Sequence, residues 1–204
     1  MDEFTAIELL KKGDLNGLES LVEKYYIQAV RSSYLIVQDP DLAEDIVQST
    51  FLSSSRKINQ LVSGRFGPWF LRSVINASIK AVKRQSKLIR LDVQEDEFTD
   101  NLKEWLFDRQ PLPETMVETE ELRQQVQKAL RLLTPNQRGA VVSKYYLEMS
   151  EVEMSHSLNA PISSIKWWLH IARRRLRQLL VGYDDQSTSK SAQSPLACGK
   201  EKES

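Results

Sequence analysis

The sequence predicts an all-α protein with two helical domains joined by an acidic linker, the C-terminal one a helix-turn-helix. Apolar residues recur three and four positions apart through most of the chain, as they do on one face of a helix, and no alternating strand pattern is sustained. Glycine is sparse, at 7 of 204 residues. The chain is neutral overall, yet its charges are separated along the sequence.

This charge separation suggests the domain boundaries. Residues 51–90 contain nine basic residues and no acidic one, whereas residues 91–121 contain eleven acidic residues and only two basic ones. A basic block followed by an acidic block indicates a surface that meets a polyanion and a connector that avoids it. The expected divisions are a first domain at 1–90, an acidic linker at 91–115, a helix-turn-helix domain at 116–182 and a disordered polar tail at 183–204.

Four helices are expected in the first domain. A short one spans about 4–12, and Asp14 is placed to cap the second. Asp39 can cap the third helix, with Pro40 in its first turn, and that helix runs to about Ser55. Its buried face is expected to consist of Ala43, Ile46, Val47, Thr50 and Phe51.

The fourth helix has an apolar face and a basic face. It is expected to begin at Pro68, after a loop at 56–67. The apolar face consists of Leu71, Val74, Ile75, Ile79 and Val82, and the other side carries Arg72, Asn76, Lys80, Lys83 and Lys87. Ordinary solvated faces mix both charge signs and this one does not, so contact with nucleic acid is favoured over a merely solvated face. Trp69 and Phe70 could stack on unpaired bases, although a core position is the commoner one.

The second domain contains two capping boxes, at 134–137 and 150–153. The helix that the first box opens is expected to bury Val141, Val142, Tyr145 and Tyr146. After a turn at 159–161, Ser163 is expected to cap a last, basic helix that runs to about Val181. A short helix, a tight turn and a longer basic helix form the pattern of a helix-turn-helix.

A helix-turn-helix places the first residues of its second helix in the major groove of DNA. The residues nearest the bases would be Ser163, Ser164, Lys166, Trp167 and His170, with Arg173, Arg174 and Arg177 on the backbone phosphates. A solvated basic face is the alternative, and the pattern alone leaves both interpretations open.

Composition argues against an enzyme and against a cofactor or metal. The sequence has no glycine-rich phosphate loop, and its one cysteine and two histidines are too few for a metal cluster. It also has no apolar run of about 18 residues and no signal-peptide core, so we expect a cytoplasmic protein without membrane insertion.

The predicted third helix carries an acidic and amide patch on its outer side, formed by Glu44, Asp45 and Gln48, which spacing alone would explain as a solubilising surface. The run DPDLAEDIVQSTFLSSSRKI at 39–58, however, resembles the polymerase-binding helix of bacterial extracytoplasmic-function (ECF) sigma factors of the sigma-70 family. The run FGPWFLRSVINASIKAVKRQ is similar to the helix that follows in that family, with Lys80 in place of the family's aspartate. Residues 129–180 resemble the family's C-terminal domain.

The resemblance implies partners for each of these surfaces. Glu44, Asp45 and Gln48 would bind the β′ clamp helices of core RNA polymerase, and the C-terminal domain would lie at the β flap while reading duplex DNA at the minus-thirty-five element. The melted minus-ten strand would be bound by Arg56, Lys57, Asn59, Arg65, Arg72, Asn76, Lys80, Lys83, Arg84 and Lys87. An anti-sigma factor is a further implied partner, and the implied function is promoter recognition, promoter melting and transcription initiation.

Two other functions stay open at this point. A stand-alone helix-turn-helix regulator would bind duplex DNA tightly without polymerase, with residues 1–90 as a sensor or dimerisation domain. An enzyme acting on nucleic acid would need a rigid carboxylate cluster, which the predicted helices lack. The acidic and amide patch and the acid-free block at 51–90 favour a sigma factor, because a sensor domain needs neither of them.

Overall fold

The computed structural model describes residues 1–61, 64–88 and 124–191, and within these ranges it is helical, without a strand. The elements are α1 (Glu3–Lys11), α2 (Asn16–Val37), α3 (Pro40–Arg56), the 3₁₀ turn η1 (Ile58–Gln60), α4 (Phe66–Leu88), α6 (Pro135–Val141), the π-helical turn η4 (Val142–Tyr146), α7 (Glu151–Leu158) and α8 (Ile162–Ser191). Residues 124–131 are also helical. The predicted all-α fold is thus confirmed, while the predicted linker at 91–115 lies outside the described residues.

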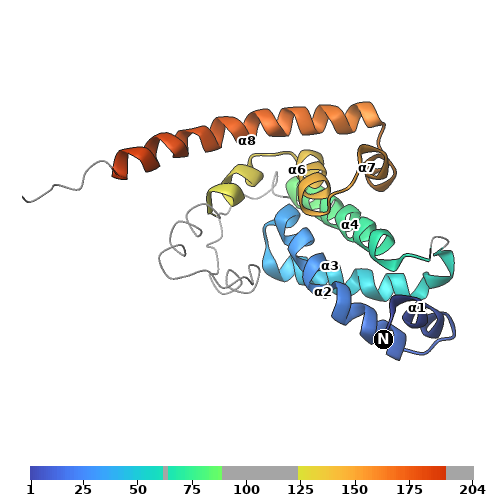
Figure 1. Cartoon of the computed structure of the whole chain (residues 1–204). Helices are drawn as coiled ribbons and strands as arrows, with labels where there is room; N and C mark the ends of the chain where they lie inside the picture. The colour runs from blue at the N-terminus through green and yellow to red at the C-terminus, as the bar shows by residue number, and fades with distance from the viewer. Residues whose placement is uncertain (62–63, 89–123, 192–204) are drawn as a thin grey trace, which may run out of the picture.

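The N-terminal helices surround a core of stacked aromatic rings. Helices α2, α3 and α4 pack on one another, and α1 lies against α2 (Figure 1). The ring of Phe70 stacks on Phe51 and Phe66, with centroids 4.0 and 5.2 Å away, and Trp69 meets Phe66 edge-on at 5.9 Å. Phe70 is fully buried, so it cannot stack on a base without unfolding this core.

Most of the predicted local signals in these helices are confirmed. Every residue predicted for the buried face of α3 is buried, and so are the first four predicted for α4. The Asp39 side chain caps α3 by accepting from the Leu42 amide at 3.0 Å. Asp14, in contrast, does not cap α2: the cap position is Leu15, and the Asp14 carboxylate accepts from the Asn16 amide at 2.9 Å.

The C-terminal helices form a second group, in which α8 lies across α6 and α7 (Figure 1). Both predicted capping boxes are present, at Thr134 and Ser150. Two predictions for this group were wrong in detail. Ser163 lies within the first turn of α8 and does not cap it, because the helix begins one residue earlier. Tyr145 is 58% exposed, because the π-helical turn changes which side chains face inward.

The last helix also continues beyond its predicted end at Val181. Its backbone stays helical to Ser191, so residues 183–191, which were expected to belong to the tail, are part of α8. The rest of that predicted tail, 192–204, lies outside the described residues.

The two groups of helices share a hydrophobic core. One buried cluster contains residues from both groups. Its members from α2 and α4 are Ile36, Ile75 and Ile79, and its members from the C-terminal group are Ala140, Val142, Met149, Met154, Ile165 and Leu169. Gly139 packs directly on the Ile79 side chain, and a Cβ at position 139 would collide with it. A larger residue at this position would require the Ile79 side chain to shift, so glycine favours the close approach of α6 to α4.

A buried arginine adds a polar link at the same junction. Arg138 Nε donates to the Leu130 carbonyl at 2.9 Å, Nη2 donates to the Arg131 carbonyl at 3.2 Å, and Nη1 donates to the carbonyl of Ile36. These acceptors lie at the C-terminal ends of two helices, where carbonyls lack helical partners and the helix dipole is negative. Burial lowers the pKa of the Arg138 guanidinium, so these carbonyls must hold the charge in place of water.

Candidate nucleic-acid interface

The predicted polymerase-binding residues lie on the outer side of α3. Asp45 and Gln48 are exposed and Glu44 is half-buried, opposite the face that packs on the core. Leu52 follows on the same face, four residues after Gln48, and is 56% exposed. An acidic and amide patch thus adjoins an exposed aliphatic side chain, as in many protein-binding surfaces where a small apolar centre has a polar rim.

Tyr26 adds a side chain from α2 to this patch. Burial raises the pKa of the Tyr26 hydroxyl, the Glu44 charge raises it further, and a hydrogen bond with Gln48 acts in the opposite direction. The hydroxyl is therefore close to both predicted residues. Sequence reasoning missed Tyr26, because helix periodicity within α3 gives no information about which residue of a neighbouring helix lies beside it.

The predicted minus-ten residues of the loop lie between α3 and α4 in the chain. Arg56, Lys57, Asn59 and Arg65 are all exposed, while η1 is anchored through buried Ile58. The first turn of α4 is held by Glu3, whose carboxylate accepts from the Phe66 amide at 2.8 Å, from Lys24 Nζ at 2.7 Å and from the Tyr25 hydroxyl. Burial alone would raise the pKa of Glu3, but these three donors outweigh it and the pKa is lowered.

The basic face of α4 forms as the spacing predicts. Arg72, Asn76, Lys80, Lys83 and Arg84 are exposed side chains of this helix. Lys87 belongs to the same helix, but the structure does not describe its side chain. We call these residues, with Arg65 at the N-terminal end of α4, the α4 stripe.

Helix α7 and the residues before it lie over the first part of the α4 stripe. Asn76 Nδ2 donates to the Ser157 carbonyl at 2.7 Å. Arg72 lines a cavity of about 490 Å³ together with Glu148 and Glu153. The pKa of Glu153 is lowered mainly by hydrogen bonds from its own capping box and additionally by the Arg65 charge. In this arrangement the first half of the stripe faces carboxylates of the same chain.

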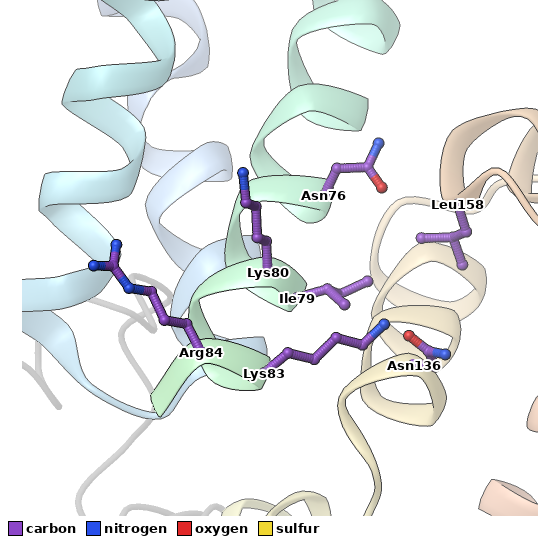
Figure 2. A pocket seen from close by; sticks show the side chains of 7 residues that line it. All are labelled: Asn76, Ile79, Lys80, Lys83, Arg84, Asn136 and Leu158. Carbon is purple, nitrogen blue, oxygen red and sulfur yellow. The ribbon is translucent and has the colours of Figure 1, made fainter. Parts of the chain in front are cut away.

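The second half of the stripe faces a different cavity, of about 500 Å³ (Figure 2). Its lining consists of Asn76, Ile79, Lys80, Lys83 and Arg84 of α4, Asn136 of α6 and Leu158 of α7. Lys83 extends from α4 toward Asn136, and the Ile79 and Leu158 side chains point toward each other (Figure 2). This described lining contains no carboxylate.

The predicted minus-thirty-five residues lie on the outer face of α8. Ser164 is half-buried, and the exposed ones are Ser163, Lys166, Trp167, His170, Arg173, Arg174 and Arg177. Trp167 is 58% exposed, which is unusual for a tryptophan in a small helical protein. Lys166 Nζ lies 3.6 Å from a Glu151 oxygen, so the start of α7 is close to this face. The turn between the two helices contains Asn159 in the left-handed conformation.

The part of the chain that the structure covers offers neither a metal site nor a membrane span. There, no group of three or more His, Cys, Asp and Glu side chains could hold a metal ion. Among those same residues, no helix combines the length and the hydropathy needed to cross a bilayer.

The sequence is similar to known proteins over most of its length. Residues 21–88 match the sigma-70 region 2 family. This range includes the whole α4 stripe and the acidic and amide patch of Glu44, Asp45 and Gln48, which we call the α3 patch. The chain is 28% identical to ECF RNA polymerase sigma factor SigW of Bacillus subtilis over 177 residues, which are 85% of this chain and 94% of SigW. It is 26% identical to ECF RNA polymerase sigma factor SigE of Mycolicibacterium smegmatis, again over 85% of this chain and over 65% of that longer relative.

A solved structure shows the same fold. The sigma factor RpoE of Bartonella quintana, crystallised in complex with the anti-sigma factor NepR, matches with a TM-score of 0.60 at 19% identity and covers 79% of this chain and 97% of RpoE. The family match lies on the helices that carry the two predicted interfaces, and the curated relatives extend the likeness into the C-terminal helices. Residues 21–88 therefore belong to the sigma-70 region 2 family, and the chain as a whole is similar to ECF RNA polymerase sigma factors.

Proposed function

We propose that this sigma factor binds core RNA polymerase, directs it to promoters and takes part in promoter melting through three separate surfaces. The observation that carries the proposal is that two surfaces of opposite charge lie on two helices that pack against each other. The α3 patch is acidic, and the α4 stripe has no acidic residue in its helix. The proposal follows the division into a polymerase-binding and minus-ten domain at 1–90 and a minus-thirty-five domain at 116–182.

The α3 patch is the proposed contact with the β′ clamp helices. It supplies the charge of Asp45, the amide of Gln48 and the exposed aliphatic side chain of Leu52. The Tyr26 hydroxyl lies beside Glu44 and hydrogen-bonds with Gln48. A small apolar centre with charged neighbours gives both affinity and orientation, because the charges steer the encounter while the apolar contact slows dissociation.

The α4 stripe and the loop before it are the proposed site for the melted minus-ten strand. Unpaired DNA exposes both phosphates and base faces, so a row of cations can follow the backbone while bases leave the stack. Extruding one base costs a few kcal/mol, which the phosphate contacts must offset. In the structure, α7 lies over part of this stripe through Asn76 and Ser157, so the proposal requires the C-terminal helices to move away when the strand binds.

The outer face of α8 is the proposed reader of duplex DNA at the minus-thirty-five element, with the C-terminal helices lying at the β flap. Lys166, Trp167 and His170 are exposed near the start of the helix, where a recognition helix meets base edges. The three arginines farther along are placed for phosphates. This division of work needs no catalytic group and no cofactor in the sigma factor itself, since the polymerase carries out the chemistry.

The proposal also assigns a location and a regulator. The protein acts in the cytoplasm, where core polymerase and the chromosome are. Because the related RpoE of Bartonella quintana is found with an anti-sigma factor, we extend an anti-sigma partner to this chain. The stand-alone regulator is not favoured, since nothing in that role requires the α3 patch.

Transcription in vitro with sigma-free core polymerase and genomic fragments tests the proposal. The protein is expected to start RNA chains at defined sites, which sequencing of the transcripts locates. Changing Asp45 and Gln48 to alanine should weaken binding to core polymerase by about tenfold or more, because both are exposed side chains of the proposed contact and their charge and amide would be lost together.

The matched control changes one acidic and one amide residue that are exposed on α2, Glu19→Ala with Gln28→Ala. This control variant should bind polymerase as the wild type does, and circular dichroism should show the same helix content for all three proteins. Equal polymerase binding by the α3 variant and the control would remove the patch from the mechanism, and the absence of any sigma-dependent transcript would refute the proposed function.

A further inference from the structure

Trp167 is a large aromatic side chain on the outer face of α8. It is 58% exposed, whereas Ile165 and Leu169, on the core face of the same helix, are 0% and 2% exposed. Position 167 lies two residues from each of them, which is about 200° around an α-helix, so the indole extends directly away from the core. Exposure alone would not indicate a function, since single apolar side chains are common on protein surfaces, but the neighbours and the position of this one do.

The neighbours of Trp167 on the outer face are polar or cationic. Ser163 lies four residues before it and His170 three residues after it, so the three side chains form one ridge, which arginines continue. From 163 to 178, a stretch that the structure describes in full, Trp167 is the only exposed apolar side chain. A face of this kind suits duplex DNA, because the phosphates on either side of a groove neutralise the cations while base edges meet the side chains between them.

The position of Trp167 along α8 agrees with a base contact. The helix begins at Ile162, so position 167 lies in its second turn. A recognition helix meets base edges with the residues of its N-terminal part, and the residues farther along reach the phosphates. Trp167 is therefore placed where the bases are read and not where the backbone is held.

The chemistry of the indole group selects among the four bases. Its ring is apolar, and its Nε1–H donates a hydrogen bond but accepts none. In the major groove, thymine presents the only apolar group of any base, the C5 methyl, beside the O4 acceptor. Guanine and adenine present acceptors without an apolar group, and cytosine presents an N4 donor that an indole N–H cannot satisfy. An indole that meets base edges therefore fits thymine better than it fits the other three.

We propose that Trp167 determines part of the minus-thirty-five specificity by packing its indole ring on the C5 methyl group of a thymine in the major groove. This inference rests on the function proposed above, and it adds the base that α8 selects at one position. The promoters that the protein recognises then carry a thymine at the contacted position. The methyl contact should be worth about fourfold in affinity, the effect of burying one methyl-sized apolar group.

Replacing single thymines with deoxyuridine tests the contact, because this change removes only the C5 methyl and keeps the O4 acceptor. The promoter is one that the transcription experiment above has located, and each thymine of its minus-thirty-five element is replaced in turn. Competition between promoter fragments measures their affinity for the holoenzyme formed from the full-length protein and core polymerase. With the wild type, at least one replacement should weaken binding about fourfold. This comparison needs no protein variant.

Two variants then connect the methyl group to the indole. Trp167→Ala should weaken promoter binding and abolish the difference between thymine and deoxyuridine at that position. Trp167→Phe should keep most of this difference, because an aromatic ring still covers the methyl group. The matched control is Tyr145→Ala, since Tyr145 is an aromatic residue with the same 58% exposure that lies in η4, outside the residues proposed to contact DNA. The control should depend on the methyl group as the wild type does.

Equal affinity for thymine and deoxyuridine at every position with the wild type would overturn the proposal and leave the sigma function intact. So would an unchanged methyl dependence in Trp167→Ala, or a mapped minus-thirty-five element without a thymine. If Trp167→Ala instead lost affinity for core polymerase, the indole would belong to a protein interface and the proposal would be wrong. The absence of any sigma-dependent transcript, in contrast, would refute the function proposed above and this inference with it.

Discussion

Glu3 is a single carboxylate that connects three parts of the N-terminal helices. It lies in the first turn of α1, accepts from Lys24 and Tyr25 of α2, and accepts from the Phe66 amide at the start of α4. Amide groups in the first turn of a helix have no helical acceptor, so the Phe66 contact satisfies a donor that would otherwise need water. This side chain therefore fixes where the α4 stripe begins.

Replacing Glu3 with glutamine should lower the free energy of unfolding by about 1–2 kcal/mol at neutral pH, since hydrogen bonds to a charged acceptor are stronger than those to a neutral amide. Because the pKa of Glu3 is lowered in the folded protein from its ordinary 4.5, its contribution is complete above that ordinary value and is lost as pH falls through the lower folded value. Urea unfolding across this range should show the two proteins converging in stability at acidic pH.

A neighbouring carboxylate provides the control for this prediction. Glu8 also lies on α1, but it pairs with Lys11 at 3.0 Å in an exposed position. Glu8→Gln should change stability by less than about 0.5 kcal/mol, as exposed ion pairs usually do. A Glu3 variant as stable as the Glu8 variant would mean that Glu3 does not hold the start of α4.

Among the helices, α4 combines two functions on opposite sides. Its inner face supplies Val74, Ile75 and Ile79 to the hydrophobic core, and its outer face supplies the stripe. Because the inner face fixes the rotation of the helix, the charged side chains of the other face stay outside the core. Substitutions on the outer face should therefore change DNA binding with little effect on folding.

Changing Lys80 and Lys83 to glutamate should block promoter opening more than it weakens polymerase binding. The two changes remove two cations that neutralise phosphates and add repulsion. The dependence of DNA binding on salt should also become less steep, by about 0.7 for each phosphate of a single strand that is no longer neutralised. Permanganate reactivity of unpaired thymines at a promoter mapped by start-site sequencing measures the opening.

The control for this prediction carries the same change in charge on α1 and the residue that follows it, Lys11→Glu with Lys12→Glu, at two exposed lysines outside the proposed DNA contacts. It should open the promoter as the wild type does. If the α4 variant opened the promoter equally well, the basic face of α4 would have no part in melting.

In the molecule as a whole, the C-terminal helices lie on the surface that is proposed to bind DNA. Gly139 and the shared cluster around Ile79 and Met154 hold α6 and α7 against α4. The neighbouring Arg138 donates a hydrogen bond to the Ile36 carbonyl at the end of α2. The carboxylates of Glu148 and Glu153 are then near Arg72 and Arg65, where phosphates would bind. In this packed form, part of the stripe is covered by groups that carry the same sign of charge as DNA.

Changing Glu148 and Glu153 to glutamine should increase the affinity of the free protein for a single-stranded minus-ten oligonucleotide several-fold, because two charges that oppose the DNA are removed. Glutamine preserves the capping box at Ser150, so α7 itself should stay folded. Fluorescence anisotropy at two salt concentrations measures the change, which should be larger at low salt.

The equivalent change elsewhere, Glu19→Gln with Glu23→Gln on α2, gives the same net charge without touching the stripe. If the affinity for the oligonucleotide rose equally in both variants, it would depend on the net charge of the protein and not on the position of α7.

Local signals in the sequence were enough to establish the all-α fold, the buried faces of α3 and α4, the caps at Asp39, Thr134 and Ser150, and the exposed basic face of α4. Each of these depends on residues within a few positions of one another, since helix period and capping are short-range properties. Tyr145 was predicted to be buried because the sequence does not show the π-helical turn in which it lies. Ser163 was predicted to be the cap because the start of α8 was placed one residue too late.

Other features depended on contacts between residues far apart in the chain, and no local pattern contains them. The meeting of Tyr26 with Gln48, the capping of α2 by Arg138 and the packing of α7 over Asn76 all join separate helices. A helical pattern states which face is apolar but not which neighbour will cover it. Residue patterns alone were thus sufficient for the helices and their charged faces. The packing of one helix on another, in contrast, decided that the first half of the α4 stripe is covered and that a cavity lies beside the second half.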